Sequence, residues 1–470
     1  MNLMTTGGQK RLREYLEKIY RQKTKKSLAV HRRAEKVMIK GGSHSLRLFA
    51  PYPVQIVGAE GACVRDADGN RYLDYWQGHY ANILGHNPAV VRSALRSAEK
   101  RGALHTGFEA ASQIELAELI LGQLGYKDFR IRFTTSGSLA TMYTVMLAMA
   151  RTGREEVLKV GGGWHGASPF LLRGIKFDAR RGFGAAESAG VPRDLIKRTW
   201  VVPFNDTQAL EDMLKRRGER IACFILEPVL GVGGFLPARR DYLKEARRLT
   251  ERYGVALIFD EIVSGFRFCP SGVQRFYGVV PDLTAFGKII GGGHTIAAVV
   301  GRWDIMKLCE RRPGGGPRVM FQGGTFSSHA TYTLTGAAMI RHLVGQADRI
   351  YPRLAASGER LRRGVEAVFR DEGVEAACTG GPGDVLTGSS LFMVHFPRKP
   401  WPALTPEVLN DPLYSDVAFR EETLKLALLT EGVHVMHGGG AISTAHAAAD
   451  ISRTIEAYGR IAALMKRFRD

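Results

Sequence analysis

The stretches LIFDEIVSGFR (Leu257–Arg267) and PDLTAFGKIIGGG (Pro281–Gly293) decide the fold expected for this chain. Each contains a short apolar run that is followed by polar or small residues, Asp260-Glu261 in the first and Gly287-Lys288 in the second. Apolar runs of this length are typical of buried parallel strands, whose two faces are both covered by helices. Because chemistry in an open α/β sheet gathers at the carboxyl ends of its strands, these residues are the first functional candidates.

The same pattern continues on both sides of these stretches. Short apolar runs alternate with amphipathic segments from about 105 to 345, at Arg130–Thr134, Val157–Val160, Ile221–Leu226, Val255–Phe259 and Ile296–Val300. Residues 54–75 predict short strands around an Asp-Ala-Asp-Gly-Asn turn. After about 350 the sequence predicts helices over 350–369, near 417–430 and from 447, with a strand over 391–396. We therefore expect a basic N-terminal helix and a segment of the small domain within residues 1–104, a large α/β domain in 105–345, and a small α+β domain in 346–470.

Composition excludes several classes of protein. The 470 residues are 45% hydrophobic and 24% charged, as in a globular chain, and no apolar run reaches the roughly 18 residues of a membrane helix. The N-terminus lacks the apolar core of a secretory signal. The five cysteines are scattered without a CxxC pair, so neither disulfides nor a metal site is predicted, and a cytoplasmic setting is expected.

The net charge of +20 leaves one alternative of another class open. Residues 1–40 hold 12 Lys or Arg against 3 Glu, and such a segment is able to bind nucleic acid or an anionic surface. The favoured interpretation is an amphipathic helix with one solvated face, so a nucleic-acid partner is not expected.

Four groups of residues next to predicted strands carry the chemistry. Thr134-Thr135-Ser136-Gly137-Ser138 opens a helix and offers N–H groups to an anion, although an ordinary Ser N-cap explains it equally well. Asp260 suits a cationic ring nitrogen, a metal or a helix cap. Lys288, between a strand and three glycines, is able to form a Schiff base when desolvated. Trp164-His165-Gly166 places an aromatic ring where it can stack on a flat group or simply pack on the surface.

Taken together and in this order, the groups resemble those of the class III aminotransferases, which use pyridoxal 5′-phosphate. The resemblance covers roughly residues 40–460 and is carried by GACVRDADGNRYLDY, FTTSGSLATM, EPVLG, LIFDEIVSGFR, GVVPDLTAFGKIIGGG and GGTFSS. The glycine-lysine pair before three glycines, 28 residues after the aspartate, is highly specific. Within the class the chain is most similar to the glutamate-1-semialdehyde aminomutase-like group. The resemblance implies a fold-type I (aspartate aminotransferase-like) large domain with a mixed, mostly parallel sheet, plus a small α+β domain.

The resemblance also implies roles for individual residues. Lys288 corresponds to the lysine that binds the cofactor aldehyde and moves a proton, and Asp260 to the aspartate that holds the ring nitrogen protonated. Thr325 corresponds to a threonine that reaches the phosphate of a neighbouring subunit, which implies a homodimer. The remaining cofactor-binding candidates are Ser136, Gly137, Ser138, Trp164, His165 and Glu227.

Departures from the aminomutase pattern favour a transaminase that acts on an amino donor and a separate acceptor. Val232 stands where the aminomutases usually carry Asn, and the segment from His437 to Ile442 lacks their glutamate. Intramolecular amino transfer in glutamate 1-semialdehyde remains the alternative. Arg47 and His79 are candidates for contact with substrate; a surface arginine and a packed histidine are the plainer interpretations.

Overall fold

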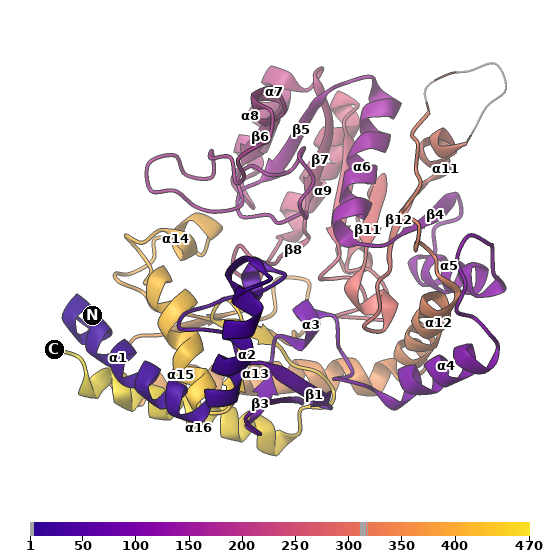
Figure 1. The fold of residues 1–470 in the computed structure, drawn as a ribbon. Coiled ribbons are helices and arrows are strands. Elements are labelled where there is room, and N and C mark those ends of the chain that lie inside the picture. Colours follow the sequence, from indigo (N-terminus) through magenta and orange to yellow (C-terminus); the bar gives the residue numbers. More distant parts are fainter. Residues whose placement is uncertain (1–3, 311–315, 317) are drawn as a thin grey trace.

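Residues 4–310, 316 and 318–470 are described by the structure, a computed structural model (Figure 1). Its largest sheet has seven strands in the order β4-β12-β11-β10-β7-β5-β6. Within this sheet β12 runs antiparallel to both neighbours and the other adjacent pairs are parallel, which confirms the expected mixed, mostly parallel sheet. The strands are β4 (Phe129–Thr134), β5 (Glu156–Val160), β6 (Thr199–Val202), β7 (Ile221–Leu226), β10 (Ala256–Glu261), β11 (Leu283–Phe286) and β12 (Ala297–Arg302).

Helices cover both faces of this sheet, which explains its unbroken apolar runs. Strand β7 is buried along its whole length: Phe224 and Leu226 pack with one group of helices, and Cys223 and Ile225 with another. The first face is covered by α8 (Thr207–Arg217) and α9 (Arg240–Tyr253), the second by α6 (Gly137–Thr152). Further helices near this sheet in the chain are α7 (Arg193–Lys197), α10 (Gln274–Tyr277) and α11 (Trp303–Met306).

Segments from the two ends of the chain share smaller sheets. Strand β15 (Val433–His434) pairs in parallel with β3 (Arg71–Asp74), beside β2 (Cys63–Asp66) and β1 (Ile56–Glu60). A second small sheet contains β13 (Ala377–Thr379), β14 (Leu391–His395) and β16 (Gly439–Ala441), and β8 (Val229–Leu230) pairs with β9 (Leu236–Pro237). The helices of these regions are α3 (Gln77–Tyr80), α4 (Ala89–Lys100), α5 (Ala111–Leu124), α12 (Ala330–Gly345), α13 (Ala347–Asp371), α14 (Pro406–Asn410), α15 (Leu424–Thr430) and α16 (Ala448–Arg467).

The basic N-terminus forms two helices, α1 (Thr6–Lys23) and α2 (Lys25–Glu35). Helix α1 is amphipathic, because Leu12, Leu16 and Tyr20 are buried while most of its charged residues face outward. It lies along α15 and α16, so the two ends of the chain meet (Figure 1). No helix in the described part of the chain is long and apolar enough to cross a membrane.

Candidate functional site

The ends of β4, β10 and β11 meet at the edge of the large sheet where the predicted site residues lie. The side chain of Ile262, just after β10, lies between two glycines of the neighbouring connections. A Cβ built at Gly137 would be 3.1 Å from Ile262 Cδ1, and one built at Gly287 would be 3.0 Å from the same atom. The start of α6, the end of β10 and the residue before Lys288 are therefore in contact around one side chain.

Asp260 is buried near the end of β10 and is held by two groups. His165 Nδ1 lies 2.8 Å from Asp260 Oδ2, and the backbone N–H of Ile262 donates to Oδ1 over 3.0 Å. Burial lowers the pKa of His165, against the opposing effect of Asp260, so the ring is neutral near pH 7. Since a carboxylate only accepts, Nδ1 carries the proton, and each carboxylate oxygen keeps a lone pair for a further donor. His165 Nε2 is buried with no hydrogen-bond partner in the described chain.

Lys288 follows β11 at the start of the short turn η3 (Lys288–Gly291). Its φ of 50° lies in the left-handed region, where a side chain strains the backbone and where functional residues are often found. Burial lowers the pKa of its amine, while Asp260 and Glu227 oppose the shift. The amine has no hydrogen-bond or ion-pair partner among the residues that the structure describes.

The first turn of α6 is formed by Gly137 and Ser138. Its cap is Ser136, whose hydroxyl accepts from the N–H of Leu139 over 3.3 Å, so the N-cap interpretation of that side chain is correct. Ser138 Oγ accepts from the N–H of Ala167, and a Cβ at Gly166 would be 2.3 Å from Ser138 Oγ. The loop that carries Trp164 and His165 therefore packs on the helix start, where N–H groups and the helix dipole favour an anion.

Trp164 and Glu227 are joined across two strand ends. Glu227 Oε1 accepts from the N–H of Trp164 over 2.9 Å, and Oε2 from the N–H of Gly231 over 3.0 Å. Burial and the nearby Asp260 raise the pKa of Glu227, against the effect of these donors. Trp164 is 40% exposed, which leaves its side chain accessible to a bound group. Val232 is half-buried just beyond this turn and offers no polar side chain.

Thr325 is exposed and lies close to the start of α6 in the same chain. Its carbonyl accepts from Thr106 Oγ1 over 2.7 Å, and a Cβ at the preceding Gly324 would be 3.1 Å from Thr135 Oγ1. Within one protomer Thr325 is thus placed near its own α6, and its role toward a partner's phosphate stays a prediction.

His79 lies in a left-handed turn, with φ of 60°, that follows β3. Its ring packs on Trp76, with centroids 4.0 Å apart, and on His44, with centroids 5.4 Å apart. Burial lowers its pKa to about 4, with smaller contributions from the nearby basic groups Arg47, His44 and Lys288. His79 is therefore neutral near pH 7, and both Arg47 and Lys288 lie near enough to affect its pKa.

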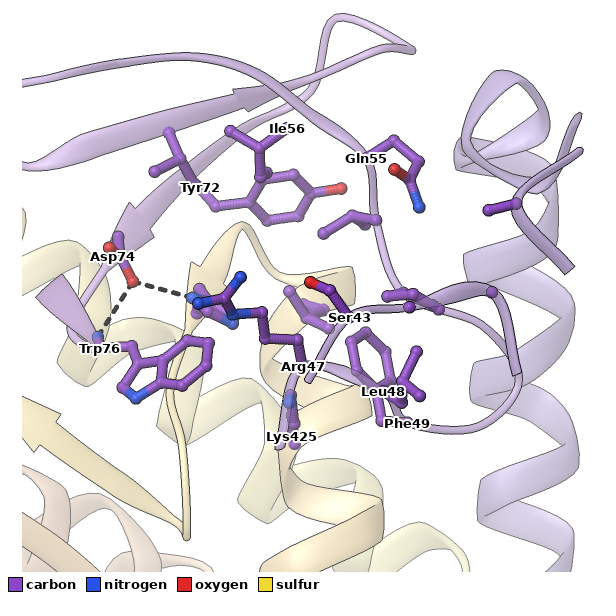
Figure 2. A pocket seen from close by; sticks show the side chains of 18 of the residues that line it. Ser43, Arg47, Leu48, Phe49, Gln55, Ile56, Tyr72, Asp74, Trp76 and Lys425 are labelled. Atoms are coloured by element: carbon purple, nitrogen blue, oxygen red, sulfur yellow. Dashed lines mark hydrogen bonds and ion pairs between the residues drawn. The ribbon is translucent and has the colours of Figure 1, made fainter. Parts of the chain in front are cut away.

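Arg47 is exposed on the segment before β1. It lines a cavity with Trp76 (Figure 2) and makes no hydrogen bond or ion pair with any described residue. Arg267, in contrast, is buried: its guanidinium donates to the carbonyls of Val263 and Tyr80, so it connects the turn after β10 to the His79 turn.

Three groups in or near this region were missed by sequence reasoning. Lys159 is buried in β5 and donates to the carbonyls of Gly163, Leu171 and Arg173. Asp74, at the end of β3, lies 2.8 Å from a nitrogen of both His86 and His434. Glu421 lies 2.8 Å from His437 in a π-helical turn. For Lys159, a lysine inside an apolar strand was the available indication.

No group of three His, Cys, Asp or Glu residues in the described ranges is arranged to hold a metal ion. His434 and His437 are instead bonded to Asp74 and Glu421, respectively.

The chain is similar to known proteins in both sequence and structure. The family model of the class III aminotransferases matches residues 48–372. Glutamate-1-semialdehyde 2,1-aminomutase of Methanothermobacter thermautotrophicus is 35% identical over 449 residues, 94% of this chain and 100% of that protein. An omega-transaminase from Sphaerobacter thermophilus has a similar structure, with a TM-score of 0.83 and 30% identity over 94% of this chain and 98% of that one. A transaminase solved with PLP bound has a TM-score of 0.82 and 27% identity over 95% and 99% of the two chains. The family match covers more than half of the chain, and the chain therefore belongs to the class III aminotransferases.

Proposed function

We propose that this protein transfers an amino group from an amino acid to a keto acid or aldehyde, with pyridoxal 5′-phosphate as its cofactor. The main observation behind the proposal concerns the Lys288 amine, which has no partner among the described residues. Lys288 lies beside the end of β10, the strand that holds the buried Asp260. A desolvated lysine without a partner is suited to attack an aldehyde.

The residues at this edge of the sheet fit the cofactor. The N–H groups at the start of α6, at Gly137 and Ser138, would take its phosphate, and the exposed face of Trp164 would cover its ring. Asp260 has acceptor capacity left for a protonated ring nitrogen. When bound, pyridoxal 5′-phosphate supplies an aldehyde that amines attack and a ring that accepts electrons when a Cα–H bond breaks.

The protein contributes nucleophile, acid–base group and charge. Burial favours the neutral form of the Lys288 amine, which is the form that attacks a carbonyl and accepts a proton from Cα. His165 fixes the orientation of the Asp260 carboxylate, so that its negative charge faces the site. Glu227 holds the backbone beside Trp164 and thereby the edge of the site.

We further propose Arg47 as the partner of the substrate carboxylate, with His79 beside it. An exposed guanidinium without an ion pair is free to bind a carboxylate in bidentate geometry. Arg47 and Lys288 both contribute to lowering the pKa of His79, so both lie near that ring, which supports this placement.

Three proposals concern the whole molecule. The active unit would be a homodimer in which Thr325 reaches the partner's phosphate site. Residues 1–104 would belong with the small domain, residues 105–345 would form the large domain, and residues 346–470 would form the rest of the small domain. Five cysteines, all free, are compatible with a cytoplasmic setting.

The proposal is tested with Lys288→Ala and Asp260→Asn. Reduction of the holoenzyme with borohydride should attach the cofactor's mass to the Lys288 peptide, and Lys288→Ala should abolish both this adduct and the near-visible absorbance band. Turnover should fall by at least about 10²–10⁴-fold, the value of a positioned acid–base group. Asp260→Asn should keep the adduct but slow proton abstraction in single turnovers. Normal turnover in Lys288→Ala would overturn the assignment.

Intramolecular amino transfer in glutamate 1-semialdehyde is the second candidate, favoured by the name of the 35% identical relative. Amino donors added one at a time should convert the bound cofactor to its amine form and release a keto acid. Rapid isomerisation of glutamate 1-semialdehyde, without response to any donor, would support the second candidate instead.

A further inference from the structure

A cavity of about 380 Å³ lies between the segment 41–56, β3 and the first turn of α15 (Figure 2). Its walls are mainly apolar and aromatic and include Leu48, Phe49, Ile56, Trp76 and Leu429. A volume of this size is at the lower end of the range for small-molecule sites, about 300–1,000 Å³. The cavity therefore has room for a small organic molecule and an apolar surface to receive it.

Lys425 brings a charge into this apolar wall. The residue is 4% exposed, and its Nζ lies 4.2 Å from the centre of the Phe49 ring. Its one side-chain hydrogen-bond partner in the described chain is Met436 Sδ at 3.8 Å, and a thioether is a weak acceptor. Burial lowers the pKa of Lys425 to about 8, so most of the amine is still protonated at pH 7. A cation so deeply buried is costly unless an anion meets it.

The carboxylates near the cavity are already engaged. Asp74, in the wall, bonds to His86, His434 and the N–H groups of Trp76 and Gln77. Glu421 is the carboxylate that acts on Lys425, but it bonds to His437 and Arg420 and lies beyond ion-pair distance of the lysine. Among the described residues, none of these acids neutralises Lys425.

A second cation stands at the rim of the same cavity. Arg47 is exposed and reaches across the space toward Trp76, again without an ion pair in the described ranges (Figure 2). Two cations thus face one apolar space whose described walls contain no uncommitted carboxylate. This combination matches a ligand with one carboxylate and an apolar body.

We propose that this cavity binds a small aromatic or branched aliphatic monocarboxylate, with its carboxylate on Lys425 and its body against Leu48, Ile56 and Trp76. Arg47 adds positive charge from the rim. Lys288 and His79 do not line this cavity, whereas Trp76 lines it and packs its ring on His79. A ligand here would fix the position of Trp76, and thus of His79, without taking part in the reaction.

The test is calorimetric binding of phenylacetate to the holoenzyme, with phenylacetamide as the neutral probe of the same shape. Lys425→Met should weaken the phenylacetate component by about 10- to 100-fold, the value of a hydrogen bond to a charged group. The amide should bind weakly to both proteins. Lys399→Met is the matched control, because Lys399 also lies over an aromatic ring, that of Tyr414, outside the cavity.

Thermal unfolding of Lys425→Met shows whether the variant is still folded, so that a loss of phenylacetate binding can be assigned to the lost charge. Met has the length of Lys without its charge, so Lys425→Met should unfold at a temperature no lower than wild type in the absence of probe. Lys425→Gln, which keeps a polar tip, should lose phenylacetate binding as well. Undiminished binding in both variants, equal binding of acid and amide, or loss on Arg47→Gln alone would overturn the proposal.

Discussion

At the scale of single residues, Lys159 shows how a buried amine organises the site. Its three carbonyl acceptors all belong to the loop 163–173, which follows β5 and carries Trp164 and His165. Burial lowers its pKa to about 7. Lys159 is therefore a positioning residue: it ties this loop to the sheet and through it orients His165 on Asp260.

Lys159→Met is expected to increase hydrogen exchange in residues 161–175 while leaving the seven-stranded sheet protected.

The free energy of unfolding should also depend on pH, and the sign of this dependence follows from the pKa of Lys159. Between about pH 7 and the unfolded pKa near 10.4, the unfolded chain binds a proton that the folded chain lacks, so the free energy of unfolding rises with pH. Wild type should gain stability over the variant across this window, by at most about 1.4 kcal/mol per pH unit. If the difference in the free energy of unfolding between wild type and Lys159→Met stayed constant from pH 7 to 9, this role would be contradicted.

The sequence predicted the placement of residues whose environment is set by their own strand. Asp260, Lys288 and Trp164 all follow or end apolar runs, so they had to meet at one edge of the sheet. Lys425 and Glu421 were not predictable in this way. Their partners, Phe49 and His437, come from other parts of the chain, and nothing local marks the contact.

At the scale of elements, the turn after β3 depends on Asp74. Residues 77–80 all have positive φ, which is unfavourable for Gln77, His79 and Tyr80. The Asp74 carboxylate accepts from the N–H groups of Trp76 and Gln77 and also holds His86 and His434. One buried carboxylate therefore stabilises a strained turn that carries His79 toward Lys288.

Asp74→Asn keeps an acceptor for the turn but removes the charge between the histidines. We expect a loss of about 1.5–3 kcal/mol in the free energy of unfolding at pH 7, the value of a hydrogen bond to a charged group. His434 and His86 lower the pKa of Asp74 despite its burial. This stabilisation is therefore fully present above the unfolded pKa near 3.9 and is lost progressively as the pH falls from there through the lower pKa of the folded state. Unfolding curves of the two proteins should converge in acid, whereas the exposed control Asp241→Asn should match wild type throughout.

The elements themselves were largely predictable. The strand expected at Ile221–Leu226 has those bounds, and the one expected at Val255–Phe259 is β10, Ala256–Glu261. Both strands are buried along their whole length, which explains why these runs are continuously apolar and easy to recognise. The π-helical turn at Phe419–Thr423 was expected only as part of a helix, because its extra residue is accommodated by tertiary contacts of Arg420 and Glu421.

At the scale of the whole molecule, the basic N-terminus is part of the folded structure. Helix α1 buries Leu12, Leu16 and Tyr20, and Lys23 Nζ donates to the carbonyl of Thr430. Part of its charge is used internally, since Arg13 pairs with Glu17 and Glu422. The packing explains the amphipathic pattern of this segment.

In the proposed dimer, each active site draws residues from both chains. If Thr325 serves the partner's phosphate site, each site takes Lys288 from one chain and Thr325 from the other. In a mixed dimer of Lys288→Ala and Thr325→Val chains, one of the two sites then has both native residues, whereas in the parent dimers no site has both. Mixing the inactive Lys288→Ala protein with the weakened Thr325→Val protein, under conditions that exchange subunits, should therefore raise activity above the average of the two.

Differently tagged chains allow the mixed dimer to be purified and its active sites to be counted by borohydride labelling of Lys288. The cis arrangement predicts the opposite outcome, because the chain that supplies Lys288 would then carry the Thr325→Val substitution in the same site. This arrangement is a genuine competitor, since a Cβ at Gly324 would already contact Thr135 within one chain. Rescue to about half of wild-type activity per mixed dimer, the share of one restored site in two, supports the shared site. Absence of rescue would contradict the shared site.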